Sequence, residues 1–179
     1  MVIMNKFITI CIDGWDYEYL DYHKMEFISL KKESFEKHVK GMMPSVTNVN
    51  NLSIISGEYP SKHEICSNYK YSKSLNQGTY VEDNKFVKSR TIFDIYNEKN
   101  LTSILATSKN KLKTLLINNN LKNNLSYSTE NPNEFLIKRF GDAPSIYTIY
   151  ANSWTISTAS MLIYEKSPDF AYISLTDYP

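Results

Sequence analysis

The chain has 179 residues, of which 42% are hydrophobic, and its 20 basic and 19 acidic side chains give a net charge of +1. This length suffices for one domain with a buried core, and balanced charge without a basic stripe argues against nucleic acid as a partner. No apolar run approaches the roughly 20 residues of a membrane-spanning helix, and the run at 7–12 is too short for a signal peptide. Two cysteines make no disulfide framework. We therefore expect a cytoplasmic protein.

The first half of the chain predicts one strand and two helices. The apolar, β-branched run KFITICI at 6–12 is typical of a strand buried in a parallel sheet. A helix is expected over much of 16–33, and the pattern TNVNNLSIIS predicts a second helix over 47–56. Residues 58–90 are expected to be irregular, apart from one hairpin near Gly78.

Helices and strands alternate in the second half of the chain. The segments that suit strands are short and apolar. In chain order we expect a helix at 91–99, a strand at 102–107, a helix at 110–117, an exposed Asn-rich loop at 118–133, a helix at 145–166 and a buried strand at 170–176.

Two carboxylates directly follow predicted strands. Asp13 comes after the first strand and Asp177 after the last. The alternation of strands and helices predicts a doubly wound α/β fold, in which ligands bind beyond the carboxyl ends of the strands. Both carboxylates are therefore expected at one edge of the sheet. Asp13 followed by glycine is, on its own, more often a simple turn than a metal ligand.

Thr47 stands at the predicted start of the helix over 47–56 and has two alternative roles. Thr47 or Asn48 would cap the helix, which stabilises it by about 1 kcal/mol, and Gly57 would close it. Alternatively, the N–H groups and partial positive charge of the helix start would hold a phosphorus oxyanion while the Thr47 hydroxyl attacks it. A hydroxyl is a poor nucleophile, so the second role requires a metal ion.

Four segments of the chain occur in the order of the blocks of one enzyme family. They are IDGW, MPSVTNVNNLSIISGEYPSKHEICSNY, ATSKNKL and DFAYISLTDYP, and they extend from Asp13 to Asp177. They resemble the phosphonoacetate hydrolases of the alkaline phosphatase superfamily, which also contains the nucleotide pyrophosphatase/phosphodiesterases. The resemblance implies an alkaline-phosphatase-like fold, a mostly parallel sheet flanked by helices. It also implies a metal-dependent hydrolase, of class EC 3.11.1, that cleaves the C–P bond of phosphonoacetate to give acetate and phosphate.

The resemblance further implies a site with two zinc ions. Asp13 would be a ligand of one zinc, Thr47 would bind that zinc and act as the nucleophile, and Asp177 would be a ligand of the second zinc. Such a pair would hold the phosphonyl oxygens and ionise first Thr47 and then a water molecule. His63 matches a structural histidine of the family, so the chain would carry only part of the ligand set.

The same resemblance implies three residues that bind substrate. Asn68 would donate a hydrogen bond to a phosphonyl oxygen, and Lys109 and Lys111 would bind the substrate carboxylate. Cleavage of the C–P bond expels a carbanion, and two cations beside the carboxylate would stabilise that charge as it develops. Without the other segments, the two lysines would more simply be a solvated helix start.

The chain departs from the family pattern in the loop after His63. Glu64 and Ser67 stand where the family usually has glycine. Both residues have less backbone freedom than glycine, which puts the shape of the substrate loop in question.

The domain of this family is about twice as long and supplies further histidine ligands after the segment that contains Asp177. Residues 1–179 are therefore expected to be the N-terminal part of a single catalytic domain, truncated at the C-terminus and inactive by itself. Its expected partners are a small phosphonate and either a second copy or a complementing C-terminal chain. The alternatives are a phosphodiesterase or nucleotide pyrophosphatase of the same superfamily, and a non-catalytic half-domain that binds a phosphate-like ligand or a partner. The lysine pair disfavours a diesterase, which needs an aromatic slot for a base.

Overall fold

The computed structural model describes residues 6–16, 18, 35, 37–118 and 120–176. Within these ranges four strands form one sheet in the order β1-β6-β4-β5, and all neighbours run parallel. Their bounds are Phe7–Ile12 for β1, Ser103–Thr107 for β4, Asn124–Ser128 for β5 and Phe170–Leu175 for β6. The predicted parallel α/β sheet is confirmed. Asp177 and most of the helix predicted over 16–33 lie outside the described residues.

Six α-helices are described. They are α2 (Thr47–Ser56), α3 (Pro60–His63), α4 (Ile92–Glu98), α5 (Asn110–Leu116), α6 (Glu134–Phe140) and α7 (Tyr150–Lys166). A short 3-10 helix covers Asn84–Phe86, and β2 (Tyr69–Ser72) and β3 (Gln77–Tyr80) form an antiparallel hairpin. Elements α4, α5, β4 and β6 confirm the sequence prediction to within one residue. In the described ranges, no helix has the length and apolar character required to cross a membrane.

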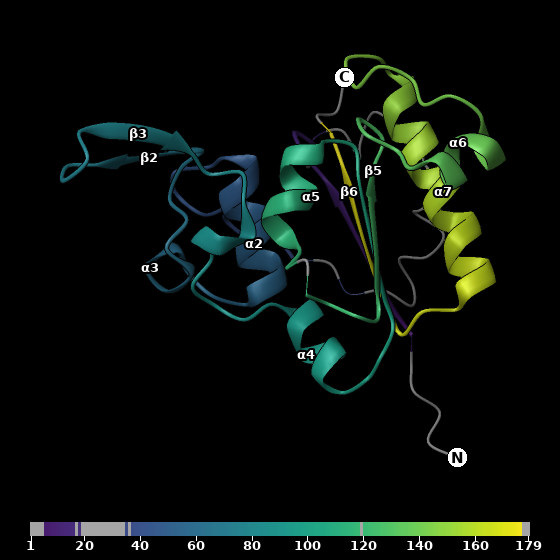
Figure 1. Ribbon diagram of the computed structural model, residues 1–179, viewed down its shortest axis with the longest axis horizontal. Helices are drawn as coiled ribbons and strands as arrows, with labels where there is room; N and C mark the ends of the chain where they lie inside the picture. Colours follow the sequence, from purple (N-terminus) through teal and green to yellow (C-terminus); the bar gives the residue numbers. More distant parts are fainter. Residues whose placement is uncertain (1–5, 17, 19–34, 36, 119, 177–179) are drawn as a thin grey trace.

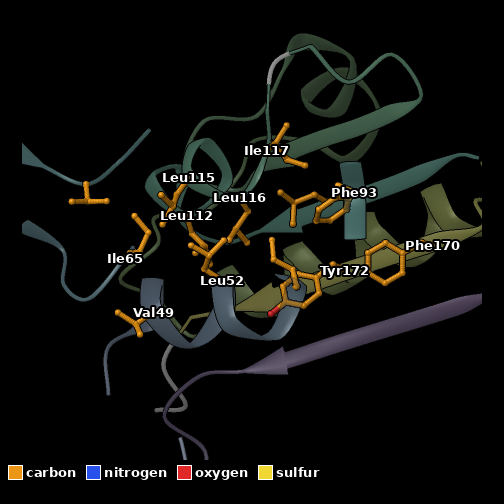
Figure 2. Packing of buried hydrophobic residues seen from close by; sticks show 13 residues of the cluster. Val49, Leu52, Ile65, Phe93, Leu112, Leu115, Leu116, Ile117, Phe170 and Tyr172 are labelled. Atoms are coloured by element: carbon orange, nitrogen blue, oxygen red, sulfur yellow. The ribbon is translucent and has the colours of Figure 1, made fainter. Parts of the chain in front are cut away.

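Two hydrophobic clusters, one on each face of the sheet, hold the layers together. Figure 1 shows α2, α4 and α5 beside one face and α6 and α7 beside the other. Successive residues of a strand point to opposite faces, so Leu105 and Tyr172 join the first cluster while Ile104 and Ile173 join the second. In the first cluster, shown in Figure 2, the α2 residue Leu52 is fully buried between the helices and the sheet. Burial of each such side chain stabilises the fold by about 1.5–3 kcal/mol.

Strand β1 is less buried than its sequence predicted. It pairs with β6 only, at the edge of the described sheet. Ile8, Ile10 and Ile12 point to one face and are 50%, 50% and 42% exposed. Cys11 points to the other face, against the first cluster, and burial raises the pKa of its thiol. The strand and its parallel pairing were predicted correctly, whereas its complete burial was wrong.

Three other predictions were wrong in part. The segment 118–133 is no exposed loop, because β5 lies within it and its Tyr127 is buried, with the hydroxyl 3.0 Å from Thr158 Oγ1. The last helix begins at Tyr150 and not at 145, and α6 precedes it. The segment 58–90 is not irregular throughout, because α3 lies within it, whereas the predicted hairpin near Gly78 is confirmed.

Candidate active site

Polar side chains gather at the carboxyl ends of the parallel strands. Asp13 follows β1, Ser108 and Lys109 follow β4, Glu130 lies two residues beyond β5, and Thr176 follows β6. Helices α2 and α5 also begin at this edge, so their first turns face the same region (Figure 1). This is the edge at which α/β sheets bind ligands. Asp177 follows Thr176 in the sequence but lies outside the described residues.

Thr47 does not cap its own helix. The N-cap of α2 is Val46, which makes no side-chain capping bond, and Thr47 is the first helical residue. Its hydroxyl instead donates to Asp13 Oδ2 at 2.6 Å, while the N–H of Gly14 donates to Asp13 Oδ1 at 3.1 Å. The predicted cap by Thr47 or its neighbour was wrong because this long-range bond takes the hydroxyl. The predicted helix end is confirmed, since Gly57 has a left-handed backbone with φ 67°.

Asn51 connects the start of α2 to the sheet. Its side-chain amide donates to the carbonyl of Thr47 at 3.0 Å, and its Oδ1 accepts from the hydroxyls of Tyr172 at 2.8 Å and Ser174 at 3.0 Å. Asn51 is only 1% exposed, and burial raises the pKa of Tyr172 above its ordinary range, so that hydroxyl keeps its proton. The position of Thr47 relative to β6 is therefore fixed by a buried side chain one helical turn away.

Asn152 on α7 fixes the chain where β6 ends. Its Oδ1 accepts from the N–H of Thr176 at 3.0 Å and from Ser108 Oγ at 3.3 Å, and its amide donates to the carbonyl of Thr176 at 3.5 Å. A single side chain thus binds both peptide groups of the residue before Asp177. The exits of β4 and β6 are held together by this contact.

A cavity of about 330 Å³ opens beside Thr47. Predicted substrate residues Asn68, Lys109 and Lys111 all line it, and so does Thr47. Lys109 directly precedes α5, and its carbonyl accepts from Thr107 Oγ1 at 2.9 Å. The last residue of β4 therefore fixes the backbone position of Lys109. The other lining residues include two glutamates and two tyrosines, namely Glu82, Glu130, Tyr80 and Tyr147. The structure therefore brings together Asp13, Thr47, Asn68 and both lysines.

Each glutamate of the cavity has a partner. Glu82 Oε1 lies 2.8 Å from Lys111 Nζ, and this hydrogen bond raises the pKa of Lys111 above its usual value. Glu130 Oε2 accepts from the backbone N–H of Asn110 at 2.7 Å, at the start of α5. The ammonium of Lys111 also lies 5.6 Å from the ring centroid of Tyr80. Lys111 is therefore engaged by the chain itself and is no simple solvated residue.

His63 is a buried structural residue, as the family pattern implied. It is 0% exposed, its Nδ1 accepts from the N–H of Ile65 at 3.2 Å, and its Nε2 lies 2.9 Å from Ser53 Oγ. Since Nδ1 is an acceptor, the ring proton is on Nε2 and is donated to Ser53. Burial lowers the pKa of His63 and keeps the ring neutral. Glu64 has φ 61°, a left-handed backbone conformation that suits the glycine usual in the family. Ser67 does not have a positive φ.

The local chemistry fits part of a metal site. A void of about 10 Å³ lies between Asp13, Thr47, Ser108 and Thr176, which is the order of size that holds one water-sized particle. Asp13 and Thr47 present oxygen atoms there, and carboxylate oxygen is a common zinc ligand. Among the residues that the structure describes, no group of three or more His, Cys, Asp or Glu side chains could hold a metal. A complete ligand set would therefore need Asp177 and further residues.

Three residues of this region were not identified from the sequence. Asn51, Glu82 and Asn152 each act through a partner that is distant along the chain. Only Asn51 had a local signal, because an amide inside the apolar face of a predicted helix must be hydrogen-bonded when it is buried. The sequence holds no comparable signal for the other two.

Comparison with known proteins identifies relatives that share this fold. Residues 7–115 match the family model described as type I phosphodiesterase / nucleotide pyrophosphatase. Phosphonoacetate hydrolase from Sinorhizobium meliloti 1021 is similar with a TM-score of 0.81, at 27% identity in its complex with phosphonoacetate and 28% in its complex with phosphonoformate. Murine ectonucleotide pyrophosphatase/phosphodiesterase 5 in complex with AMP is similar in fold alone, with a TM-score of 0.65 and 13% identity.

The matched structures are longer than this chain. The comparison covers 98% of this chain and 47% of the phosphonoacetate hydrolase, and 98% of this chain and 44% of the murine protein. The chain thus spans about half the length of these relatives. Because the family model covers more than half of the chain and the sheet, helices and neighbours agree, this alkaline-phosphatase-like chain belongs to the type I phosphodiesterase/nucleotide pyrophosphatase family.

Proposed function

We propose that residues 1–179 are the N-terminal part of one catalytic domain, and that the complete protein hydrolyses phosphonoacetate to acetate and phosphate. The position of Thr47 carries this proposal. Its hydroxyl lies 2.6 Å from the Asp13 carboxylate, at the first residue of a helix and beside a cavity lined by two lysines. Similarity to a hydrolase solved with phosphonoacetate supports this substrate over other phosphorus compounds.

Asp13, Thr47 and Asp177 would hold zinc. Asp13 and Thr47 would share one ion at the void between them, and Asp177 would contribute to a second. Bound zinc would neutralise charge on the phosphonyl oxygens and lower the pKa of a coordinated hydroxyl or water. The buried network through Asn51 keeps Thr47 oriented for this purpose.

The residues of the chain would divide the reaction between them. The Thr47 hydroxyl loses its proton to solvent, its oxygen forms a bond to phosphorus, and the C–P bond breaks with its electron pair on carbon. Lys109 and Lys111 stabilise the resulting carbanion through its carboxylate. That carbanion takes a proton from water to give acetate. The hydroxide left behind attacks phosphorus, the bond from phosphorus to the Thr47 oxygen breaks with its electron pair on oxygen, and this oxygen takes a proton back from solvent as phosphate leaves. Asn68 holds a phosphonyl oxygen throughout.

The substrate is tested by substituting Lys109. In the complete protein, Lys109→Ala should lower kcat/KM for phosphonoacetate by about 100- to 1,000-fold, the range for loss of a group that stabilises developing charge. Cleavage of a nitrophenyl phosphodiester, which has no carboxylate, should change far less. Phosphate and nitrophenol release measure the two reactions. Lys113→Ala, in the helix that follows Lys109 but outside the cavity, is the control, and equal losses with both substrates would contradict the proposal.

A phosphodiesterase or nucleotide pyrophosphatase is the second candidate, and the cavity itself gives it support. Tyr80 and Tyr147 line the cavity and are 65% and 92% exposed, so their rings are available to stack on an aromatic group of a substrate. The murine relative of the same fold was solved with AMP. The diesterase is favoured if Tyr147→Ala lowers the rate of diester cleavage without changing the rate of phosphonoacetate hydrolysis. It is also favoured if Tyr147→Ala lowers diester cleavage in a protein that does not hydrolyse phosphonoacetate at all.

A further inference from the structure

Glu82 occupies the position that a carboxylate ligand of Lys111 would take. Its Oε1 lies 2.8 Å from Lys111 Nζ. The same ammonium belongs to the cavity beside Thr47, and it is one of the two cations assigned above to the substrate carboxylate. In the described structure this cation is therefore already paired with a carboxylate of its own chain.

Three hydrogen bonds hold the backbone of Val81 and Glu82 in place. The Glu82 carbonyl accepts from Thr114 Oγ1 at 2.6 Å, on the same helix as Lys111. The preceding residue, Val81, donates its N–H to the carbonyl of Asn68 at 2.9 Å and accepts from Asn48 Nδ2 at 3.3 Å. These bonds place Glu82 beside Lys111 through α2, α5 and the Asn68 loop. The fold therefore sets the backbone position of Glu82 beside Lys111.

The side chains of the pair are nevertheless exposed enough to separate. The Lys111 side chain is 63% exposed and that of Glu82 is 37% exposed. An ion pair with this exposure is weak, because water solvates both groups when they part. A ligand with its own carboxylate would replace the lost partner of Lys111, whereas the fixed backbone would keep Glu82 close enough to return.

The other charges of the cavity make this exchange important. Glu130 is the second carboxylate: it accepts from the Asn110 N–H, and its charge raises the pKa of Lys111 less than Glu82 does. Lys109 and Lys111 are thus matched by an equal number of negative charges. An incoming anion meets a weak field until Glu82 leaves Lys111.

We propose that Glu82 is a resident competitor for the substrate carboxylate. It holds Lys111 when the cavity is empty, yields it to a ligand carboxylate, and takes it back when the carboxylate product leaves. Glu82 therefore determines how strongly the cavity binds carboxylate-bearing ligands in particular. This inference rests on the proposed function, because that function assigns Lys111 to a carboxylate.

NMR titration of the Lys111 side chain tests the exchange in the complete protein with Thr47→Ala, which prevents turnover. Phosphonoacetate and methylphosphonate, which lacks the carboxylate, are the two probes. In Glu82→Gln the half-saturating concentration of phosphonoacetate should fall by about two- to fivefold, the factor expected for loss of an exposed ion pair, with little change for methylphosphonate. Glu82→Asp, which keeps the charge but withdraws it from Lys111, should be intermediate. Glu130→Gln, the matched control, should leave the ratio of the two probes unchanged.

The outcomes separate this inference from the proposed function. An equal change for both probes in Glu82→Gln would show a general effect of charge. It would overturn the role proposed for Glu82 and leave the proposed function standing. If the Lys111 signal of every variant fails to respond saturably to phosphonoacetate, the carboxylate role of Lys111 is wrong, and both proposals fall. Backbone amide spectra identify a variant that fails to fold, and Glu82→Asp then supplies the comparison.

Discussion

Thr47 and Thr91 both stand at the start of a helix on the same side of the sheet, and they use their hydroxyls differently. Thr91 is the N-cap of α4, where its Oγ1 accepts from the N–H of Asp94 at 3.3 Å and its own N–H donates to Asp94 Oδ2 at 2.7 Å. This reciprocal capping box serves the helix alone. Thr47 is the first residue within α2, and its hydroxyl donates to Asp13, 34 positions earlier in the chain.

The difference shows how a helix start becomes available for chemistry. Helix α2 has no side-chain cap, so its stability depends on packing and on the buried contact of Asn51 with β6. The hydroxyl of Thr47 is thereby released from a structural task. Helix α4 has seven residues, and its capping box adds local stability at its start.

The strongest test of this comparison is Thr47→Ala. In the complete protein it should reduce phosphonoacetate hydrolysis by about 10,000-fold or more, as removal of a nucleophile does elsewhere. The free energy of unfolding should fall by only about 1 kcal/mol, since the hydrogen bond to Asp13 is lost but no capping bond is. Phosphate release and urea denaturation measure the two quantities. Thr47→Ser, which retains the hydroxyl, is the control and should keep measurable activity. Wild-type rates in Thr47→Ala would refute the nucleophile.

The next largest effect should come from Asn51→Ala. The substitution leaves the buried hydroxyls of Tyr172 and Ser174 without their acceptor, and each such loss costs about 1–3 kcal/mol. We expect the protein to lose about 3 kcal/mol of stability in urea denaturation. Asn50→Ala is the matched control on the same helix. It loses bonds to Met42 and Val46, which are less buried, and should cost about 1 kcal/mol. Equal losses would mean that Asn51 has no special role.

Apolar patterns made much of the fold predictable. Strands β4 and β6 are mainly apolar and buried along their whole length, and α4 and α5 have helical spacing, so local sequence and tertiary structure agree. Strand β5 was missed because NLSYS is polar in three of five positions, and only its pairing with β4 makes it a strand. Helix α6 did carry a signal, since Asn133 caps it by accepting from the N–H of Leu136 at 3.0 Å.

The candidate site was predictable to a different degree. The apolar run at 6–12 placed Asp13 at the end of a strand. The resemblance to a family supplied the roles of Asn68, Lys109 and Lys111, and these roles remain predictions. The partner of each group was not predictable. The bond between Thr47 and Asp13 and the pair between Lys111 and Glu82 join segments separated by about thirty residues, and only the packed fold decides which polar groups meet.

Thr91→Ala tests the other half of the comparison. Loss of the capping bond should lower the free energy of unfolding by about 1 kcal/mol, measured by urea denaturation. The catalytic rate of the complete protein should stay unchanged, because Thr91 lies outside the cavity beside Thr47. Asp94→Ala, which removes the other half of the capping box, should have a similar effect on stability. A loss of activity at unchanged stability would mean that the two threonines do not differ as described.

The smallest expected effect concerns helix ends. Gly57 closes α2 and Glu64 closes α3 in the same left-handed conformation, with φ 67° and 61°. A residue with a Cβ is strained there by about 1 kcal/mol, whereas glycine adds some entropy to the unfolded chain. Glu64→Gly should therefore stabilise the protein by about 0.5 kcal/mol. Ser67→Gly is the control: Ser67 lacks a positive φ, and its Oγ accepts from the N–H of Tyr69 at 3.3 Å. That variant should be neutral or less stable in urea denaturation, and stabilisation of equal size in both would show that backbone conformation is not the cause.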